Sequence, residues 1–478
     1  MVRFMVPTLA VLAASAAVTC HSRPDGDRVQ LQSRYSASDL AKRDGQKDYT
    51  HVCSRIASSI SPSAVHYPGS PVYTWLNSHF SASSNQPSAC VAEPRSALDV
   101  STIAKRVLRL LASQTVEIGT GLKWDDVYAA LEPHGVSVAG GRVTDVGVGG
   151  FTLGGGYSWK TNQHGLTIDT VSAFELVKPN GDVVKVMEAH DSELFFGLKG
   201  ASNNFLFFKG IVTKITLKTF AQGQVWGGFL AFTDPQAIAG LGAATAKFST
   251  QVKDPKASIL SSFSYLQGNP FSGVQLFYDG PNPPPGIFDD FLALPSSLAN
   301  VSTRSHLSLI LSTPANETYG LRTYFDTVPV VDYSPEFLEL VRDTSAAAGQ
   351  ELASTSLLMF NLVAEPFLPT ILSHNPSRTA YPFTRAKMYT PFNIAVSWTN
   401  ATDDKVIAEV VKKVRNTLSK ALVAEGQSDI VDAPLYPNYA LYDTPVERLY
   451  GSNLPALKAL KARVDPTNVM GLAGGFKV

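Results

Sequence analysis

The spacing of apolar residues predicts helices and strands in the first half of the chain. From 99 to 113 the apolar positions recur every three or four residues, as in an amphipathic helix. From 211 to 219 successive residues alternate between two faces, a pattern typical of a half-buried strand. Shorter patterns predict a strand at 115–118, a helix at 124–131, and a hairpin whose strands 173–177 and 183–187 flank Pro179-Asn180-Gly181-Asp182.

The chain changes character near residue 221. From 221 to about 430 it is rich in proline and aromatic residues, and its apolar spacing follows no single period. A short helix is expected at 456–464, ending at Asp465-Pro466 because proline cannot continue a helix. Several aromatic residues of this region are candidates for a substrate pocket or for the core, and we expect the core: Tyr265, Phe277, Tyr278, Phe360, Tyr389 and Trp398.

The N-terminus has the order of a secretory signal peptide. Arg3 precedes the apolar run 4–18, and small residues lie just before Cys20. A membrane anchor is the alternative, but the run is shorter than the ~20 residues of a bilayer span. We therefore expect a signal peptide at 1–19, a polar leader at 20–50 and a secreted protein. Three N-glycosylation sequons agree with export: Asn300-Val301-Ser302, Asn316-Glu317-Thr318 and Asn400-Ala401-Thr402.

Length and charge narrow the function classes. At ~150 residues per domain, 478 residues allow about three units or two large ones. The 40 basic and 40 acidic residues cancel, which argues against nucleic acid or an anionic membrane surface as a partner, because both attract an excess of positive charge. With 44% apolar and 17% charged residues, a disordered or coiled-coil protein is excluded.

The three cysteines are too few for a four-ligand zinc site or a disulfide-rich scaffold, and no metal site is expected. In an oxidising compartment Cys53 and Cys90 are free to form a disulfide. Two buried thiols are the alternative.

The segment 140–156 is the most informative feature, because eight of its seventeen residues are glycine. Glycine lets the backbone approach a ligand closely and adopt positive φ, so that amide groups can line a pyrophosphate or a flat ring. A flexible linker is the alternative, but interspersed residues such as Phe151, Tyr157 and Trp159 have no use in a solvated linker. The glycine spacing does not match the Rossmann pattern, and the chain has no Walker A, zinc-protease or nucleophile-elbow motif.

The sequence Gly-Gly-Arg-Val-Thr-Asp-Val-Gly-Val-Gly-Gly-Phe-Thr-Leu-Gly-Gly-Gly-Tyr-Ser-Trp at 140–159 resembles secreted fungal FAD-linked oxidases of the berberine-bridge-enzyme-like group. That group belongs to the vanillyl-alcohol-oxidase/p-cresol-methylhydroxylase (PCMH) superfamily. The resemblance continues at 162–169, 193–200, 210–213, 436–439 and 464–469. Cys53 and Cys90 also match positions that are bridged in relatives.

This resemblance implies an α+β fold. A PCMH-type FAD-binding domain would use 51–220 and the C-terminal segment 431–478, and an α+β substrate-binding domain, 221–430, would be inserted between them. Tyr436 would be the base that takes a hydroxyl proton, for which a pKa near 10 must shift; an ordinary buried aromatic is the alternative. Val146 matches a position that gates oxygen in relatives, where valine favours oxidase behaviour. The implied cofactor-binding residues are Val146, Gly147, Val148, Gly149, Gly150, Thr152, Gly154, Gly155, Gly156, Asp169, Ile211, Val212 and Asn438.

The chain departs from the family pattern in two places. Relatives carry several dozen residues before the strand at 115, including a phosphate-binding loop and the histidine that bonds to flavin, whereas this chain runs directly from Lys105 to Gln114. The cysteine that forms a second flavin bond in some relatives corresponds to Val143. Part of the FAD domain is therefore expected to be missing, and any FAD to be non-covalent. Residues 206–209 look inserted; misplaced exon boundaries or a real adaptation explain both departures.

Two function classes remain open. The first is a secreted FAD-dependent oxidoreductase that oxidises an alcohol, a sugar or an activated C–H group of a small-molecule substrate by hydride transfer to flavin. Molecular oxygen would then accept the electrons and form hydrogen peroxide. The second is a non-catalytic secreted glycoprotein of this family, or a gene-model artefact, that has lost firm FAD binding.

Overall fold

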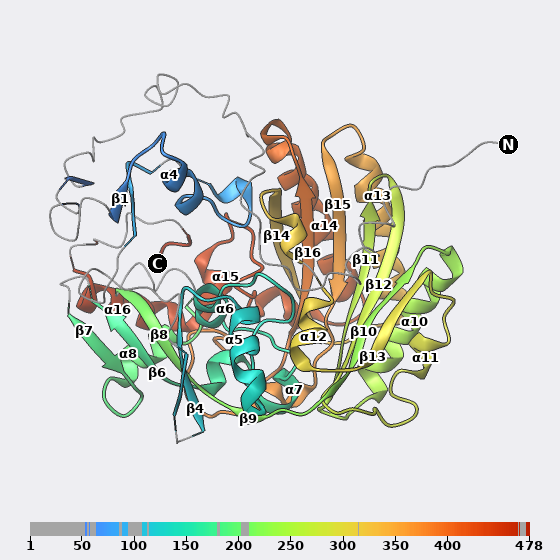
Figure 1. Ribbon diagram of the computed structural model, residues 1–478. Coiled ribbons are helices and arrows are strands. Elements are labelled where there is room, and N and C mark those ends of the chain that lie inside the picture. The colour runs from blue at the N-terminus through green and yellow to red at the C-terminus, as the bar shows by residue number, and fades with distance from the viewer. Residues whose placement is uncertain are drawn as a thin grey trace.

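The computed structural model describes residues 53–54, 57, 64–85, 88–93, 108–111, 114–178, 182–201, 210–313, 315–466, 468 and 475–478. Helices and strands are mixed in an α+β fold built around two antiparallel sheets (Figure 1). The expected α+β class is therefore confirmed. The signal peptide, the leader and the apparent insertion at 206–209 lie outside the described residues. Among the described helices, none has both the length and the apolar character that crossing a membrane requires.

The five-stranded sheet is built from the first half of the chain. Its strands, in spatial order, are β3 (Leu108–Leu111), β4 (Thr115–Gly119), β8 (Ile211–Lys218), β6 (Val171–Val177) and β7 (Val183–Val186). The expected strands at 115–118 and 211–219 are confirmed as β4 and β8. The hairpin is confirmed by the pairing of Val177 with Val183.

The helix expected at 99–113 is wrong over its last part, because 108–111 form strand β3, which pairs with β4. The rest of that prediction lies mainly in the undescribed residues 94–107. Leu108 and Leu111 fit the three-residue spacing of a helix, but Leu108 and Leu110 also fit the two-residue spacing of a strand. Pairing with the edge of β4 decides between the two.

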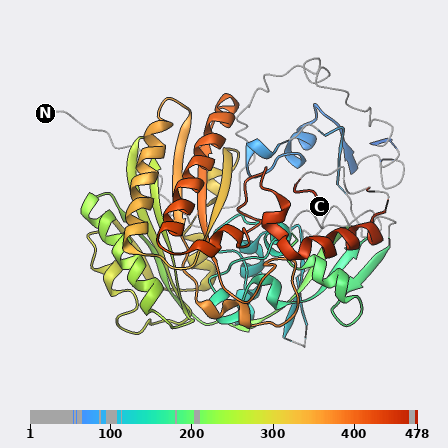
Figure 2. The same cartoon turned by 180° about the vertical axis from the view of Figure 1, so that it is seen from behind.

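The seven-stranded sheet follows residue 221 and is covered by long helices on one face (Figure 2). The helices are α10 (Pro235–Gln251), α13 (Pro335–Glu351) and α14 (Asp404–Ala424). The strands, in spatial order, are β13 (Leu298–Arg304), β10 (Val225–Phe232), β12 (Asn269–Tyr278), β11 (Ala257–Leu266), β15 (Leu357–Ala364), β16 (Thr390–Trp398) and β14 (Arg322–Val330).

The amino-acid pattern explains why the long helices cover this sheet. Asp234 and Ser334 cap α10 and α13 with their side chains, and a proline follows each cap at the first helical position. In α14 the buried residues recur at helical spacing and pack on the sheet: Ile407, Val411, Val414, Leu418 and Leu422. The helix-covered face of the sheet is thus the main hydrophobic core, and its opposite face is left for other contacts.

The aromatic residues of the second region largely take the expected place in the core. Phe277, Phe360 and Trp398 are fully buried, and Tyr265 and Tyr278 are nearly so. Tyr389 packs from a partly buried position against the core that contains Tyr265, Tyr278, Phe360 and Trp398, whereas Phe277 belongs to the core around the five-stranded sheet.

Shorter helices complete both parts of the molecule. The helices expected at 124–131 and 456–464 are confirmed as α5 and α16, and α16 packs against α8. Their bounds, with the remaining helices, are α4 (Pro71–Leu76), α5 (Trp124–Leu131), α6 (Val148–Leu153), α7 (Thr161–His164), α8 (Ser192–Leu198), α11 (Asp289–Leu292), α12 (His306–Leu311), α15 (Val446–Tyr450) and α16 (Leu454–Val464). Two small sheets pair β1 (Val65–His66) with β2 (Val91–Ala92) and β5 (Val136–Ser137) with β9 (Phe220–Ala221).

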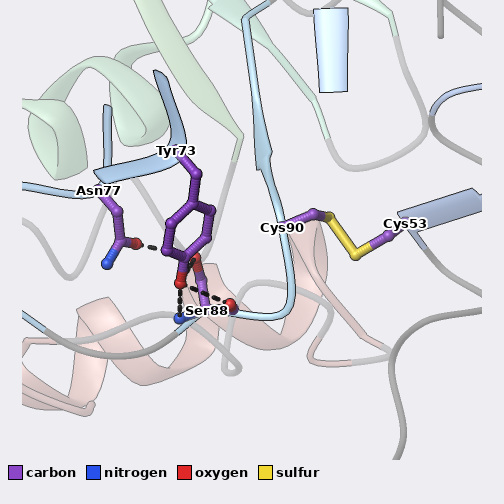
Figure 3. Close-up of a disulfide and its surroundings, with 5 residues drawn as sticks. All are labelled: Cys53, Tyr73, Asn77, Ser88 and Cys90. Carbon is purple, nitrogen blue, oxygen red and sulfur yellow. Dashed lines mark hydrogen bonds between the residues drawn. A yellow bond between two sulfur atoms is a disulfide. The ribbon is translucent and has the colours of Figure 1, made fainter. Parts of the chain in front are cut away.

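Cys53 and Cys90 form a disulfide (Figure 3). The expected bridge is confirmed, and the alternative of two buried thiols is wrong. Nearby, the Tyr73 hydroxyl of α4 donates to the backbone oxygen of Ser88 at 2.7 Å and accepts from its amide at 3.0 Å. Both contacts hold the segment before Cys90 against α4.

Candidate functional site

The glycine run includes α6, which lies between the two sheets (Figure 1). A β-carbon on Gly154 would lie 1.9 Å from Oδ1 of Asn438, and Gly155 and Gly156 adopt φ values of +123° and +81°. Such φ values are strained for any other residue. The run is therefore a packed turn and not a linker, and the close approach to Asn438 ties it to the C-terminal segment.

Tyr436 is a buried residue whose hydroxyl oxygen accepts two hydrogen bonds. The Gly156 amide donates at 3.2 Å, and Nδ2 of Asn438 donates at 2.9 Å. The same Asn438 nitrogen donates to the backbone oxygen of Phe151 at 3.1 Å, which fixes the orientation of the amide. Gly156 of the glycine run and Asn438 thus both direct N–H groups at the Tyr436 oxygen.

Aromatic rings surround Tyr436. Tyr157 and Tyr439 meet its ring edge-on, each at 4.8 Å between centroids, and Tyr381 lies 5.5 Å away. Burial raises the pKa of Tyr436 to about 12, against the lowering effects of the Asn438 hydrogen bond and of the Arg142 charge. Tyr436 is therefore protonated at neutral pH in the free protein.

A buried ion pair lies beside this tyrosine cluster. Nη2 of Arg142 contacts Oε2 of Glu365 at 2.7 Å and donates to the Tyr439 hydroxyl at 2.8 Å. Tyr439 in turn donates to Oε1 of Glu365 at 2.9 Å. Arg142 is 8% exposed and Glu365 is 3% exposed. The Glu365 charge holds the pKa of Arg142 above its usual range, so the guanidinium is charged.

A cavity of about 660 Å³ opens where these residues meet the uncovered face of the seven-stranded sheet. Tyr436, Asn438 and Arg142 line one wall. Its floor includes residues that are aligned across neighbouring strands, such as Asn361 of β15 and Phe325 of β14, which both pair with Ala395 of β16. Side chains from one sheet face therefore reach the same space as the Tyr436 oxygen.

Part of the set of expected cofactor-binding residues lines this cavity. Val146, Gly147, Gly150 and Asn438 do so, together with the expected base Tyr436. Six other positions of the run are buried behind the lining and stay predictions: Val148, Gly149, Thr152, Gly154, Gly155 and Gly156.

Asp169, Ile211 and Val212 lie away from the cavity lining. The Asp169 carboxylate contacts Nη2 of Arg385 at 2.9 Å and accepts from the Leu166 amide at 3.0 Å. Ile211 and Val212 are paired with β6, and the Val212 carbonyl accepts from the Thr120 hydroxyl at 2.7 Å. These contacts give the three residues structural roles, and cofactor binding there stays a prediction.

The residue pattern did not identify three residues of the site: Arg142, Glu365 and Tyr439. Arg142 and Tyr439 lie inside the motifs at 140–159 and 436–439 that carry the resemblance. Their place in these motifs could therefore have identified them as candidate site residues. Glu365 follows the apolar strand β15 and carried no such signal, because its partner Arg142 is 223 positions away.

The cavity fits a flat ring with polar edges, such as the isoalloxazine of FAD. Gly147 and Gly150 expose backbone there, and a β-carbon on Gly147 would meet no atom within 4 Å. Val146 and Phe151 add apolar contacts. The lining does not provide for the pyrophosphate in the same way, because Arg142, the single cation among the lining residues that the structure describes, is already paired with Glu365. Residues that would hold the pyrophosphate must lie outside this lining.

Two family profiles match the chain. The profile described as FAD binding domain matches residues 79–187, and the one described as Berberine and berberine like matches residues 435–473. The second match contains Tyr436 and Asn438.

Curated fungal proteins are similar over most of the chain. An uncharacterized FAD-linked oxidoreductase of Arthroderma benhamiae is 30% identical over 396 residues, which cover 77% of this chain and 75% of that protein. The FAD-dependent monooxygenase sdcF of Emericella nidulans is 27% identical over 89% of this chain and 98% of that protein.

Solved structures share the fold. A chitooligosaccharide oxidase superposes with a TM-score of 0.70 at 19% identity, covering 87% of this chain and 97% of that one. The wild-type BBE-like 1 protein of Physcomitrella patens gives a TM-score of 0.67 at 17% identity over the same shares.

Proposed function

Because this chain belongs to the berberine-bridge-enzyme-like family of FAD-linked oxidoreductases, we propose that it oxidises a neutral small molecule at an alcohol, a sugar hydroxyl or an activated C–H group. Oxygen is the proposed electron acceptor. The observation that carries this proposal is the Tyr436 oxygen, which faces two N–H donors at the wall of a cavity. Hydrogen bonds donated to an oxygen stabilise its deprotonated form, and here they oppose the larger effect of burial on the pKa of Tyr436, which supports a role as proton acceptor.

Residues of the glycine run would hold the flavin ring. Gly147 and Gly150 offer open backbone, and Val146 and Phe151 offer apolar contact. Val143 also lines the cavity, and its apolar side chain cannot form the thioether that a cysteine forms, which supports non-covalent binding. When bound, FAD supplies the acceptor for a hydride, and its reoxidation by oxygen yields hydrogen peroxide.

The chain's own residues then have three tasks. Tyr436 would first lose its own proton to solvent, and its phenolate would then take the hydroxyl proton as the substrate carbon gives up its hydride, so that an alcohol becomes a carbonyl. Asn438 orients and stabilises the tyrosine oxygen. The surrounding rings of Tyr157, Tyr381 and Tyr439 exclude water from it.

The domain division is also a proposal. A FAD-binding part at 51–220 and 431–478, with a substrate-binding part at 221–430, is supported by the strands of the two sheets, which fall on either side of residue 221. Secretion is supported by the sequence pattern at 1–19 and by two sequon asparagines, Asn300 and Asn400, that are exposed.

A second candidate function is a non-catalytic secreted glycoprotein. The observation that favours it is the pairing of Arg142 with Glu365, which leaves the described part of the cavity lining without a free cation for a pyrophosphate.

An absorption spectrum of the purified secreted protein distinguishes the two candidates. The oxidase proposal expects a flavin band that moves into the supernatant after acid precipitation, together with peroxide formation on a panel of alcohols and sugars. A protein that shows no band after incubation with excess FAD would support the non-catalytic alternative. A band that stays with the precipitate would contradict non-covalent binding.

A further inference from the structure

The Arg142 guanidinium has unused hydrogen-bond donors at the cavity. Arginine carries five N–H groups, and the contacts to Glu365 and Tyr439 both use Nη2. Within the described part of the chain, Nε and Nη1 make no hydrogen bond. One face of the guanidinium lies 5.8 Å from the ring centroid of Phe367, and the residue lines the cavity. The side chain is therefore held rigidly with donors to spare.

Glu365 and Tyr439, in contrast, direct their polar groups at Arg142 and at each other. Both carboxylate oxygens of Glu365 accept hydrogen bonds, one from Arg142 and one from Tyr439. The Tyr439 hydroxyl accepts from Arg142 and donates to Glu365. A ligand that meets this wall of the cavity thus finds unused donors on Arg142, whereas Glu365 is only 3% exposed and each of its oxygens already accepts one hydrogen bond.

The charge of the cavity lining is balanced. Among the described residues that line it, Arg142 and Glu365 are the only charged ones, and they neutralise one another. A carboxylate placed on Arg142 would put a second negative charge beside Glu365 in a poorly solvated space, and an ammonium group would meet Arg142 without a free counter-charge. An uncharged oxygen, by contrast, accepts a hydrogen bond from Arg142 without upsetting the balance.

We propose that Arg142 is a substrate-binding residue that donates to an uncharged oxygen, such as a carbonyl, hydroxyl or ring ether, and that Glu365 makes the site reject carboxylates. Tyr439 connects this contact to the chemistry, because its ring packs on Tyr436 while its hydroxyl contacts Arg142. The oxygen bound by Arg142 and the group that gives its proton to Tyr436 would then belong to the same molecule. The substrate class is a neutral, oxygen-bearing molecule with an apolar body that suits floor residues such as Phe229 and Met359.

This inference rests on the proposed function only in treating the cavity as the substrate site. Ligand binding tests it without turnover, by titration calorimetry on the full-length purified protein. The probes are benzamide and benzoate, which have nearly the same shape and differ in charge. Wild-type protein is expected to bind benzamide at least tenfold more tightly than benzoate.

Variants assign the discrimination to named residues. Glu365→Gln removes the negative charge and leaves Arg142 unbalanced, so the preference for benzamide should fall at least tenfold. Arg142→Gln should weaken benzamide binding about tenfold. The matched control is Glu175→Gln, a half-buried glutamate on β6 that pairs with Lys214 and does not line the cavity; it should leave the preference unchanged.

A wild-type protein that binds neither probe, or binds benzoate as tightly as benzamide, would overturn the inference. So would an unchanged preference in Glu365→Gln with a normal unfolding transition. If Glu365→Gln does not fold, the inference is judged on two other results: the preference of the wild-type protein for benzamide over benzoate, and the affinity of Arg142→Gln for benzamide. A protein that discriminates as expected but forms no peroxide would remove the oxidase proposal and leave this binding site in place.

Discussion

Asn438 occupies the place where a β-carbon on residue 154 would stand, because that carbon would lie 1.9 Å from its Oδ1. The contact joins two segments that are far apart in the sequence. It also holds Asn438 where its Nδ2 reaches the Tyr436 oxygen at 2.9 Å. The glycine at 154 is thus a requirement for the position of the tyrosine.

Gly154→Ala should displace Asn438 and destabilise the protein by about 1–3 kcal/mol, the usual cost of overpacking a filled site. Denaturant unfolding measures it. The control is Gly147→Ala, because that β-carbon would meet no atom within 4 Å and the backbone φ of −69° is ordinary. Equal stabilities for the two variants would contradict the packing described above.

Tyr436→Phe should lower kcat by about 10²–10⁴-fold, the range for loss of a proton-transfer group, while the ring packing is kept. Steady-state peroxide formation measures this. Tyr450→Phe is the matched control, because Tyr450 is buried, its hydroxyl donates to the Ala201 carbonyl at 2.9 Å, and it does not line the cavity. Intact turnover in Tyr436→Phe would restore the alternative of an ordinary buried aromatic.

These two predictions concern site residues that could be predicted in part from the sequence. The glycine run and the C-terminal motif indicated Tyr436 and Asn438, because motifs keep neighbouring residues together. The contact between Arg142 and Glu365 could not be predicted from the sequence. It depends on where β15 ends in a sheet whose strand order departs from chain order. The segment 108–111 shows a limit of secondary-structure prediction from apolar spacing. Its four residues fit both helical and strand spacing, and only pairing with β4 decides between them.

The ion pair between Lys160 and Asp279 should be important for stability. Nζ of Lys160 is fully buried and lies 2.5 Å from Oδ2 of Asp279. The same Oδ2 accepts from the Gln163 side chain, and Oδ1 of Asp279 accepts from the Gln222 side chain. Lys160→Met should cost about 3–5 kcal/mol, because it leaves a charge without its partner. Unfolding free energies of both single variants and of Lys160→Met/Asp279→Leu form a double-mutant cycle. The double variant should be more stable than Lys160→Met, and strict additivity would refute the coupling.

Asp326 should make stability depend on pH. It is fully buried on β14, and burial raises its pKa from 3.8 to about 6 despite its contact with Arg415. The folded state therefore holds this proton more tightly than the unfolded chain. The resulting stability is fully present below pH 3.8 and is lost as the pH rises to about 6, by at most about 3 kcal/mol.

Unfolding free energies measured between pH 4 and 6.5 test this contribution. Asp326→Asn should make the decline smaller, whereas the exposed Asp290→Asn, which loses its pair with Lys247, should leave it unchanged. A constant difference between wild type and Asp326→Asn across this range would show that the carboxyl does not titrate there.

The two faces of the seven-stranded sheet are under different constraints. One face is filled by α10, α13 and α14 and holds the main core, whereas residues such as Asn361 and Ser397 on the other face line the cavity. A substitution on the cavity side changes what the protein recognises while the packing that stabilises the fold stays intact. Selection can therefore alter the substrate one side chain at a time on an unchanged scaffold, and a library restricted to this face is the natural starting point for re-engineering specificity.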